Sequence, residues 1–127
     1  PPRQLSLAER AAIARFRQEA EWQAQSVLIA SSSPAWSLTI SNRSDFLPTC
    51  LNRCLRLVEI SDLAQLQTVL PPQRRLLEAC GLAAPAVRSG ELEAMLAGAG
   101  VHRVCALGEM QRPTLAWRQG GLSRLPV

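Results

Sequence analysis

The chain has 127 residues, and its 47% hydrophobic content excludes a disordered chain and suits a domain that buries a core without metal or disulfides. All fourteen basic residues are arginines, and with ten acidic residues they give a net charge of +4 at pH 7. The arginines are scattered from Arg3 to Arg124, and no tyrosine interleaves with them as a stacking platform. We therefore expect ordinary solvated faces in preference to a nucleic-acid surface.

The sequence also lacks the features of a membrane or exported protein. No stretch reaches the roughly 20 apolar residues that span a bilayer, and no charged segment precedes an apolar run at the start. We interpret residues 1–127 as a single α/β domain of a cytoplasmic protein, taken from a longer chain.

The first element is a helix. Ser6 and Glu9 have the spacing of a capping box, and the apolar stripe that follows predicts a helix to about Gln25. Two β-prone segments follow, Val27–Ala30 and Trp36–Ile40. In the second segment the alternation predicts that Trp36, Leu38 and Ile40 point inward and that Ser37 and Thr39 point outward.

The middle of the chain alternates between strand and helix patterns. Leu55–Ile60 is predicted to be a strand that is covered on both faces. Ser61 or Asp62 then caps a short helix from Leu63 to about Leu70, which Pro71 and Pro72 end.

Segment 75–82 is ambiguous, because its first residues favour a helix and its last residues suit a strand. After it, Ser89 is predicted to cap a helix over Gly90–Ala99, with Gly100 in the left-handed position that ends it. Val101–Cys105 is then predicted to be a short strand. This order of elements predicts a mostly parallel sheet with flanking helices.

The four cysteines do not have metal-ligand spacing. Cys50 and Cys54 are four residues apart, Cys80 and Cys105 stand alone, and His102 is the single histidine, so we expect no metal site. Small buried hydrophobic residues are the default interpretation of these cysteines. The exception is Cys50, which follows a proline in a less apolar loop and could be a reactive thiol.

The C-terminal stretch from Gly100 to Gly121 has no periodic pattern, and its residues look individually placed. Met110 and Trp117 could line a channel for an apolar chain, or they could pin this loop to the sheet. Arg103 is predicted to be a satisfied structural arginine. Four residues are expected to shape the loop: Gly108, Pro113, Gly120 and Gly121.

Several stretches resemble the LuxC-type acyl-CoA reductases, which belong with the aldehyde dehydrogenases. The resemblance is carried mainly by Gly100–Cys105 and by the run that joins Gly108, Met110-Gln111-Arg112-Pro113, Leu115 and Trp117. Further likenesses are Leu51-Asn52-Arg53 with Leu55–Leu63, the helix Leu5–Arg10, and Ala35-Trp36. The resemblance covers nearly the whole chain and implies the C-terminal portion of such a reductase.

The resemblance implies what the complete protein does. Such an enzyme reduces a fatty acyl-CoA to the aldehyde with NADPH, through a thioester on a catalytic cysteine. The nucleophile and the dinucleotide domain would lie upstream of Pro1, so no catalytic residue is expected in this chain, and the chain alone should be inactive.

The matching order of elements implies the later half of an aldehyde-dehydrogenase-like catalytic domain, with Leu76–Leu82 as a strand. It places Asn52 and Arg53 where contacts to the cofactor ribose arise. Arg53 could pair with a cofactor phosphate or form a salt bridge.

Partners follow from the same resemblance. The parent enzyme would take an acyl-CoA substrate, and a homo-oligomer is compatible with the sequence. The alternative function is a noncatalytic α/β module that binds an acidic partner or nucleic acid through its arginines.

Overall fold

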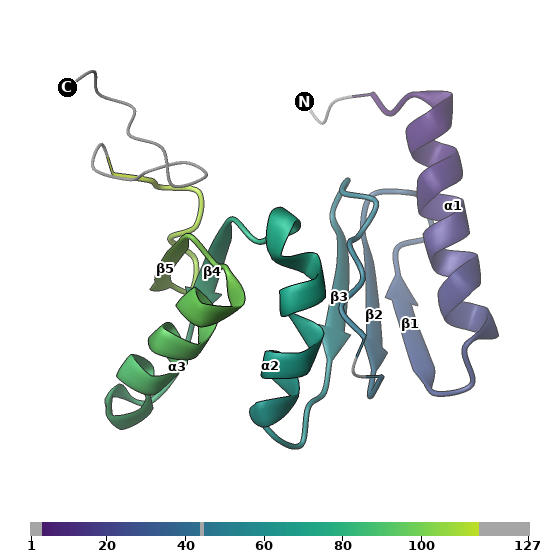
Figure 1. Cartoon of the computed structure of the whole chain (residues 1–127). Helices are drawn as coiled ribbons and strands as arrows, with labels where there is room; N and C mark the ends of the chain where they lie inside the picture. Colours follow the sequence, from purple (N-terminus) through teal and green to yellow (C-terminus); the bar gives the residue numbers. More distant parts are fainter. Residues whose placement is uncertain (1–3, 44, 115–127) are drawn as a thin grey trace. The chain divides into compact units, whose positions relative to one another are not determined.

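The computed structural model describes residues 4–43 and 45–114, in two compact units that divide between Asp62 and Leu63. Each unit contains both helices and strands (Figure 1), so the predicted α/β class is confirmed. We describe the two units separately. The interpretation of residues 1–127 as one domain stays a prediction.

The first unit begins with helix α1, Leu7–Trp22. The predicted capping box is present, because the Ser6 hydroxyl accepts from the Glu9 amide at 3.2 Å and the Glu9 carboxylate accepts from the Ser6 amide at 2.8 Å. The helix ends earlier than Gln25, since Gln23 already has extended backbone angles. Ile13, Phe16 and Ala20 form its buried face.

A three-stranded sheet follows, made of β1 (Ser26–Ala30), β2 (Ser37–Ser41) and β3 (Cys54–Val58) in that spatial order. β2 and β3 are parallel, but β1 and β2 are antiparallel, which corrects the expectation of a mostly parallel sheet for this unit. The physical reason is the short connection over residues 31–36, which turns the chain back beside itself, whereas a parallel pair needs a crossover of about a dozen residues.

Helix α1 covers the polar face of this sheet. Ser37 and Thr39 are only 1% and 3% exposed, while Trp36 is 44% exposed, so the predicted inward face of β2 was wrong. The alternation was present, but α1 supplies Arg17, whose Nε donates to the Ser37 hydroxyl at 2.8 Å. A buried hydroxyl with a charged donor is tolerated where an unpaired one would be costly.

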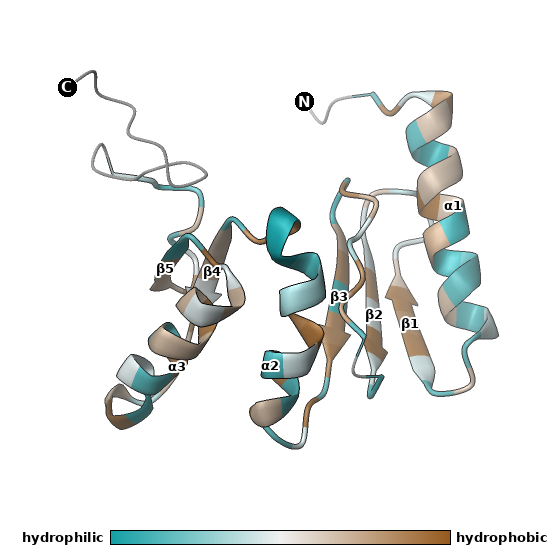
Figure 2. Ribbon diagram, in the orientation of Figure 1, coloured by the Kyte–Doolittle hydropathy of each residue, from teal (hydrophilic) through white to brown (hydrophobic). Residues whose placement is uncertain are grey.

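The opposite face of the sheet is apolar by strand register, and Figure 2 shows hydrophobic residues along these strands in brown. Strand register places six side chains together on it: Val27, Ile29, Leu38, Ile40, Leu55 and Leu57. Leu55 and Leu57 are 64% and 53% exposed, so the prediction that both faces of this strand are covered was wrong.

The second unit contains α2 (Ala64–Val69), a 3₁₀ helix η1 (Pro71–Leu76), β4 (Ala79–Leu82), α3 (Ala86–Ala99) and β5 (Arg103–Ala106). β4 and β5 pair in parallel and are connected through α3, which makes a β-α-β unit. Its core consists of Leu70, Leu96, Ala99 and Val101.

The helix boundaries of this unit depart from the sequence expectations at two caps. Leu63 stands at the N-cap position of α2, later in the chain than the predicted cap at Ser61 or Asp62. Helix α3 starts at Ala86, with Pro85 at the N-cap position and no side-chain cap hydrogen bond.

Ser89 lies inside α3 and donates to the Pro85 carbonyl at 3.3 Å, so it is not the cap that the sequence predicted. The predicted end of α3 is confirmed, with Gly100 at φ 105° in the left-handed region. A Cβ at this glycine would collide with the Arg74 side chain.

Candidate functional site

A strained turn precedes β3. Leu51, Asn52 and Arg53 have φ values of 63°, 52° and 59°, which places three consecutive non-glycine residues in the left-handed region. Each such residue costs roughly 1–2 kcal/mol relative to the ordinary helical region. Two backbone hydrogen bonds hold the turn, from the Cys54 amide to the Leu51 carbonyl at 3.0 Å and from the Ser37 amide to the Arg53 carbonyl at 3.1 Å. Strain of this kind gathers at functional positions.

Asn52 and Arg53, the two residues predicted to contact a cofactor, both lie in this turn. Asn52 is half-buried, and its Nδ2 donates to the Cys50 carbonyl at 3.4 Å. The Arg53 side chain is exposed. The turn thus presents one guanidinium at the surface and holds one amide against its own backbone.

A pocket of about 270 Å³ lies beside the turn, between α1 and β3. Sequence reasoning missed it, because its residues come from three separated stretches. They are Ala12, Arg15, Phe16, Glu19, Pro48, Thr49, Cys50 and Arg56. The one available signal was Arg56, a charged residue on the same face of β3 as the buried Cys54.

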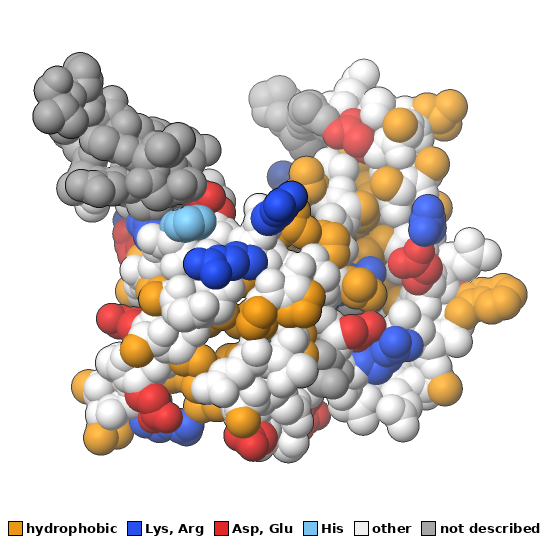
Figure 3. Space-filling view, viewed as in Figure 1, with side chains coloured by type: hydrophobic (Ala, Val, Ile, Leu, Met, Phe, Trp, Pro, Cys, Tyr) orange, Lys and Arg blue, Asp and Glu red, His pale blue; other side chains and the backbone are white. Residues whose placement is uncertain are grey.

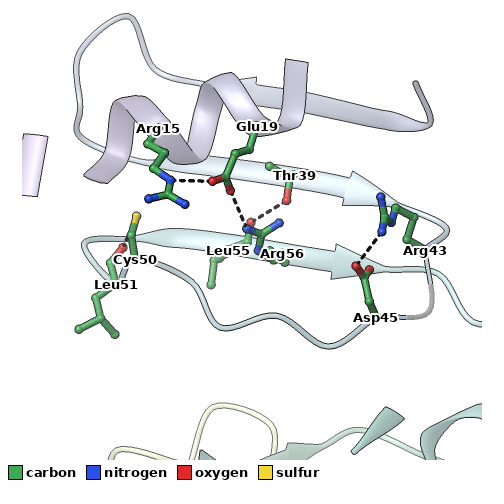
Figure 4. Close-up of polar contacts among 9 residues, drawn as sticks. All are labelled: Arg15, Glu19, Thr39, Arg43, Asp45, Cys50, Leu51, Leu55 and Arg56. Carbon is green, nitrogen blue, oxygen red and sulfur yellow. Dashed lines mark hydrogen bonds and ion pairs between the residues drawn. The ribbon is translucent and has the colours of Figure 1, made fainter. Parts of the chain in front are cut away.

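Figure 4 shows how the charged side chains of this pocket lie. Glu19 bridges two arginines, because its Oε1 is 2.8 Å from Arg15 Nε and its Oε2 is 3.7 Å from Arg56 Nη2. The first distance is a good hydrogen bond, whereas the second is too long for one.

Arg56 is held mainly by packing. Its side chain is 18% exposed, and its guanidinium carbon lies 4.8 Å from the centroid of the Phe16 ring. That distance fits a cation–π contact. Its Nε is buried and has no hydrogen-bond partner among the described residues. This buried donor is therefore covered by protein atoms and has no acceptor among the described residues.

The thiol in this pocket is not activated. Burial, together with the neighbouring Cys54 thiol, raises the pKa of Cys50 to about 11. Burial also raises the pKa of Cys80, with a further contribution from Cys105. Both groups are protonated at neutral pH, and a protonated thiol is a poor nucleophile.

The cysteines bear out part of the default interpretation. All four are free, Cys54 is buried, and the other three are half-buried. Among the residues that the structure describes, no group of three or more potential ligands could hold a metal ion.

The loop after β5 is described only as far as residue 114, so Trp117, Gly120 and Gly121 lie outside the described residues. Gly108 has φ 93°, in the left-handed region, and Pro113 is exposed. Met110 packs over Gly81, where an added Cβ would lie 3.4 Å from Met110 Cγ. This contact fits the pinning role, while the channel role stays a prediction.

Arg103 fastens the same loop. Its guanidinium donates to the carbonyl oxygens of Met110, Glu109 and Arg112 at 2.8, 2.9 and 3.0 Å. It is thus a structural arginine, as the sequence suggested.

The model of the acyl-CoA reductase (LuxC) family matches residues 1–126. The chain belongs to that family. This assignment confirms the resemblance drawn from the sequence, over almost the whole chain. A search of curated proteins found no match. In the described part of the chain, no helix is both long and apolar enough to cross a membrane.

Proposed function

We propose that this chain is the C-terminal portion of an NADPH-dependent fatty acyl-CoA reductase, which converts an acyl-CoA to an aldehyde. The observation that carries the proposal is the family match over residues 1–126. NADPH would supply the hydride, and the cysteine that forms the thioester would lie in the part of the enzyme that precedes this chain. A cytoplasmic location and homo-oligomer formation stay predictions.

The cysteines of this chain support the proposal that the thioester-forming cysteine lies outside it. A thioester-forming cysteine reacts as the thiolate, so enzymes lower its pKa with nearby cations or a helix N-terminus. Here the pKa shifts of Cys50 and Cys80 go the opposite way. This direction favours a nucleophile elsewhere in the complete enzyme.

The strained turn is the part of this chain that we assign to the cofactor. A guanidinium presents a planar fork of donors that matches a phosphate, and an amide can bond a ribose hydroxyl. Arg53 is exposed and Asn52 is next to it, so the residue types fit those groups of NADPH. Backbone strain at both positions also supports the assignment, because such strain clusters at ligand-binding sites.

Variants of the complete reductase test this assignment. Asn52→Gly removes the amide while keeping the left-handed backbone, and Arg53→Gln removes the fork. We expect each to raise the KM for NADPH by about tenfold, with little change in the KM for the acyl-CoA. Arg43→Gln is the matched control, because Arg43 pairs with Asp45 at the surface of the same unit. Unchanged NADPH kinetics in both variants would remove the turn from the cofactor site.

A second experiment tests whether this chain is inactive alone. The chain is mixed with tetradecanoyl-CoA and NADPH, and NADPH oxidation and acylation of each cysteine are followed. We expect neither, whereas the complete reductase should show both. Acylation of a cysteine in the isolated chain would place the nucleophile within these residues and contradict the proposal.

The alternative of a basic binding module has less support. Figure 3 shows acidic side chains next to basic ones on the visible face of both units. Two further arginines, Arg17 and Arg103, are engaged with backbone carbonyls of their own units. Arginines used in this way contribute little to an electrostatic footprint for nucleic acid.

A further inference from the structure

Helix α1 has a second face with apolar side chains that the fold of its own unit does not use. One face of the helix packs through Ile13, Phe16 and Ala20, and α1 contacts β1 and β2 (Figure 1). The opposite face includes Leu7 and Trp22, which are 77% and 81% exposed. A tryptophan with this exposure is unusual, because tryptophan side chains are largely buried on average and contribute strongly to interfaces.

The exposed residues of this face follow a helical spacing. Positions 7, 11, 14, 18 and 22 are three or four residues apart, which places them in one stripe along the helix. The stripe consists of Leu7, Ala11, Ala14, Gln18 and Trp22, and all five are exposed. The two large apolar side chains lie at its ends, and the alanines between them would allow another helix to approach closely.

The stripe is complementary to a reversed copy of itself. The pairs Leu7–Trp22 and Ala11–Gln18 have the same midpoint, between residues 14 and 15. A twofold axis at this midpoint places Leu7 of one copy against Trp22 of the second copy. A surface hollow of about 540 Å³, which Gln18 and Trp22 help to line, offers room for that leucine. The antiparallel direction also pairs the two helix dipoles favourably.

The charges beside the stripe indicate the same arrangement. Arg10 and Glu21 lie on one flank of it, where both line a groove of about 550 Å³ between α1 and residues 32–34. Both side chains are exposed, and neither forms an ion pair with another of the described residues. A twofold axis brings the same flank of each copy together, so Arg10 of one copy lies near Glu21 of the second copy. A parallel pair would instead bring like charges together.

We propose that this face of α1 is a dimer interface, in which α1 of one chain packs antiparallel on α1 of a second copy. Leu7 and Trp22 make its main apolar contacts, and Arg10 and Glu21 form two equivalent ion pairs across the twofold axis. The interface does not include the residues of the proposed cofactor turn, and its test does not use reductase activity.

Sedimentation velocity of the full chain tests whether it dimerises. One helix pair is a small interface beside the roughly 1,200–2,000 Å² of a stable complex, so we expect monomers at about 5 μM and dimers at about 500 μM. Trp22→Ser should weaken dimerisation at least about tenfold, because tryptophans are frequent anchors of interfaces. Val87→Ser is the matched control. Val87 is 90% exposed on α3 of the second unit, so its loss should leave dimerisation unchanged.

Charge variants test the antiparallel arrangement. Ala14→Glu places two carboxylates next to the twofold axis while keeping a good helix former, and it should abolish the dimer. Arg10→Glu and Glu21→Arg should each weaken dimerisation, because like charges then face each other. The variant with both changes should dimerise as the parent chain does. All these positions are exposed, so the helical circular dichroism should stay the same.

The proposal is overturned if the chain remains monomeric at about 500 μM, or if Trp22→Ser and Val87→Ser affect dimerisation equally. A dimer that persists in Ala14→Glu would lie on another surface. If the double charge variant dimerises no better than the single variants, the helices are not antiparallel. None of these results bears on the reductase assignment, which is tested through NADPH kinetics.

Discussion

Arg17 and Arg56 both lie between α1 and the first sheet, but the protein uses them differently. Arg17 donates to the Ser37 hydroxyl and to the carbonyl oxygens of Ser31, Ser33 and Trp36, at 2.7 to 3.2 Å. Arg56 has a ring beneath it, a distant carboxylate and an unpartnered Nε. One arginine holds the β1–β2 connection through hydrogen bonds, and the other is held mainly by packing. Burial of a charge alone therefore does not reveal its role, whereas the inventory of its donors does.

The thiol beside Arg56 gives the largest expected effect. Because the pKa of Cys50 is raised to about 11, its thiolate fraction at pH 8 should be roughly a hundredfold below that of an exposed cysteine. Alkylation by iodoacetamide, followed at each cysteine by mass spectrometry, should accelerate about tenfold per pH unit until the pH nears 11. A midpoint near pH 8.5 would show that Arg56 activates this thiol, contrary to our description.

Removing Arg17 should cost the most stability. Arg17→Met removes the donor to the Ser37 hydroxyl, which is 1% exposed, and one hydrogen bond from each of three carbonyl groups, of which those of Ser33 and Trp36 keep a bond from Ser31. We expect the free energy of unfolding to fall by about 2 kcal/mol, measured by urea denaturation. Arg10→Met, at an exposed position of the same helix, is the control and should change stability by less than about 0.5 kcal/mol.

Arg103 in the second unit is the intermediate case. It also donates to three backbone carbonyls, but these hydrogen bonds are exposed, so water can replace the guanidinium. We expect Arg103→Met to cost about 1 kcal/mol and to speed amide hydrogen exchange in residues 107–112. A loss as large as that of Arg17→Met would mean that burial does not set the strength of these contacts.

Glu19 should matter least. Its side chain is 43% exposed, and solvent weakens both of its ion pairs. Glu19→Gln should therefore lower the free energy of unfolding by about 0.5 kcal/mol or less. A loss near 2 kcal/mol would show that the ion pair between Glu19 and Arg56 is stronger than its 3.7 Å separation indicates.

Local signals in the sequence predicted several elements well. The capping box at Ser6 and the glycine end of α3 were read correctly, because each depends on a few neighbouring residues. The strand β4 was recovered through the family resemblance, although it is shorter than expected.

The remaining features depend on residues far apart in the sequence. The prediction for β2 had the wrong face inward, because Arg17, twenty positions earlier, donates a hydrogen bond to the Ser37 hydroxyl on the face that α1 covers. The left-handed turn at Leu51, Asn52 and Arg53 contains no glycine, which is the residue that usually indicates such a backbone in a sequence. The Arg56 pocket joins α1, a loop and β3, and no single stretch carries its pattern.

The most direct test of the contrast is to measure Arg17→Met and Arg56→Met side by side by urea denaturation. Arg56→Met replaces a poorly bonded charge with an apolar chain of similar length, so we expect a change within about 0.5 kcal/mol, or a slight gain. We expect the two variants to differ by about 2 kcal/mol. Equal losses in the free energy of unfolding would contradict this expectation, because Arg56 would then stabilise the fold as much as Arg17 does.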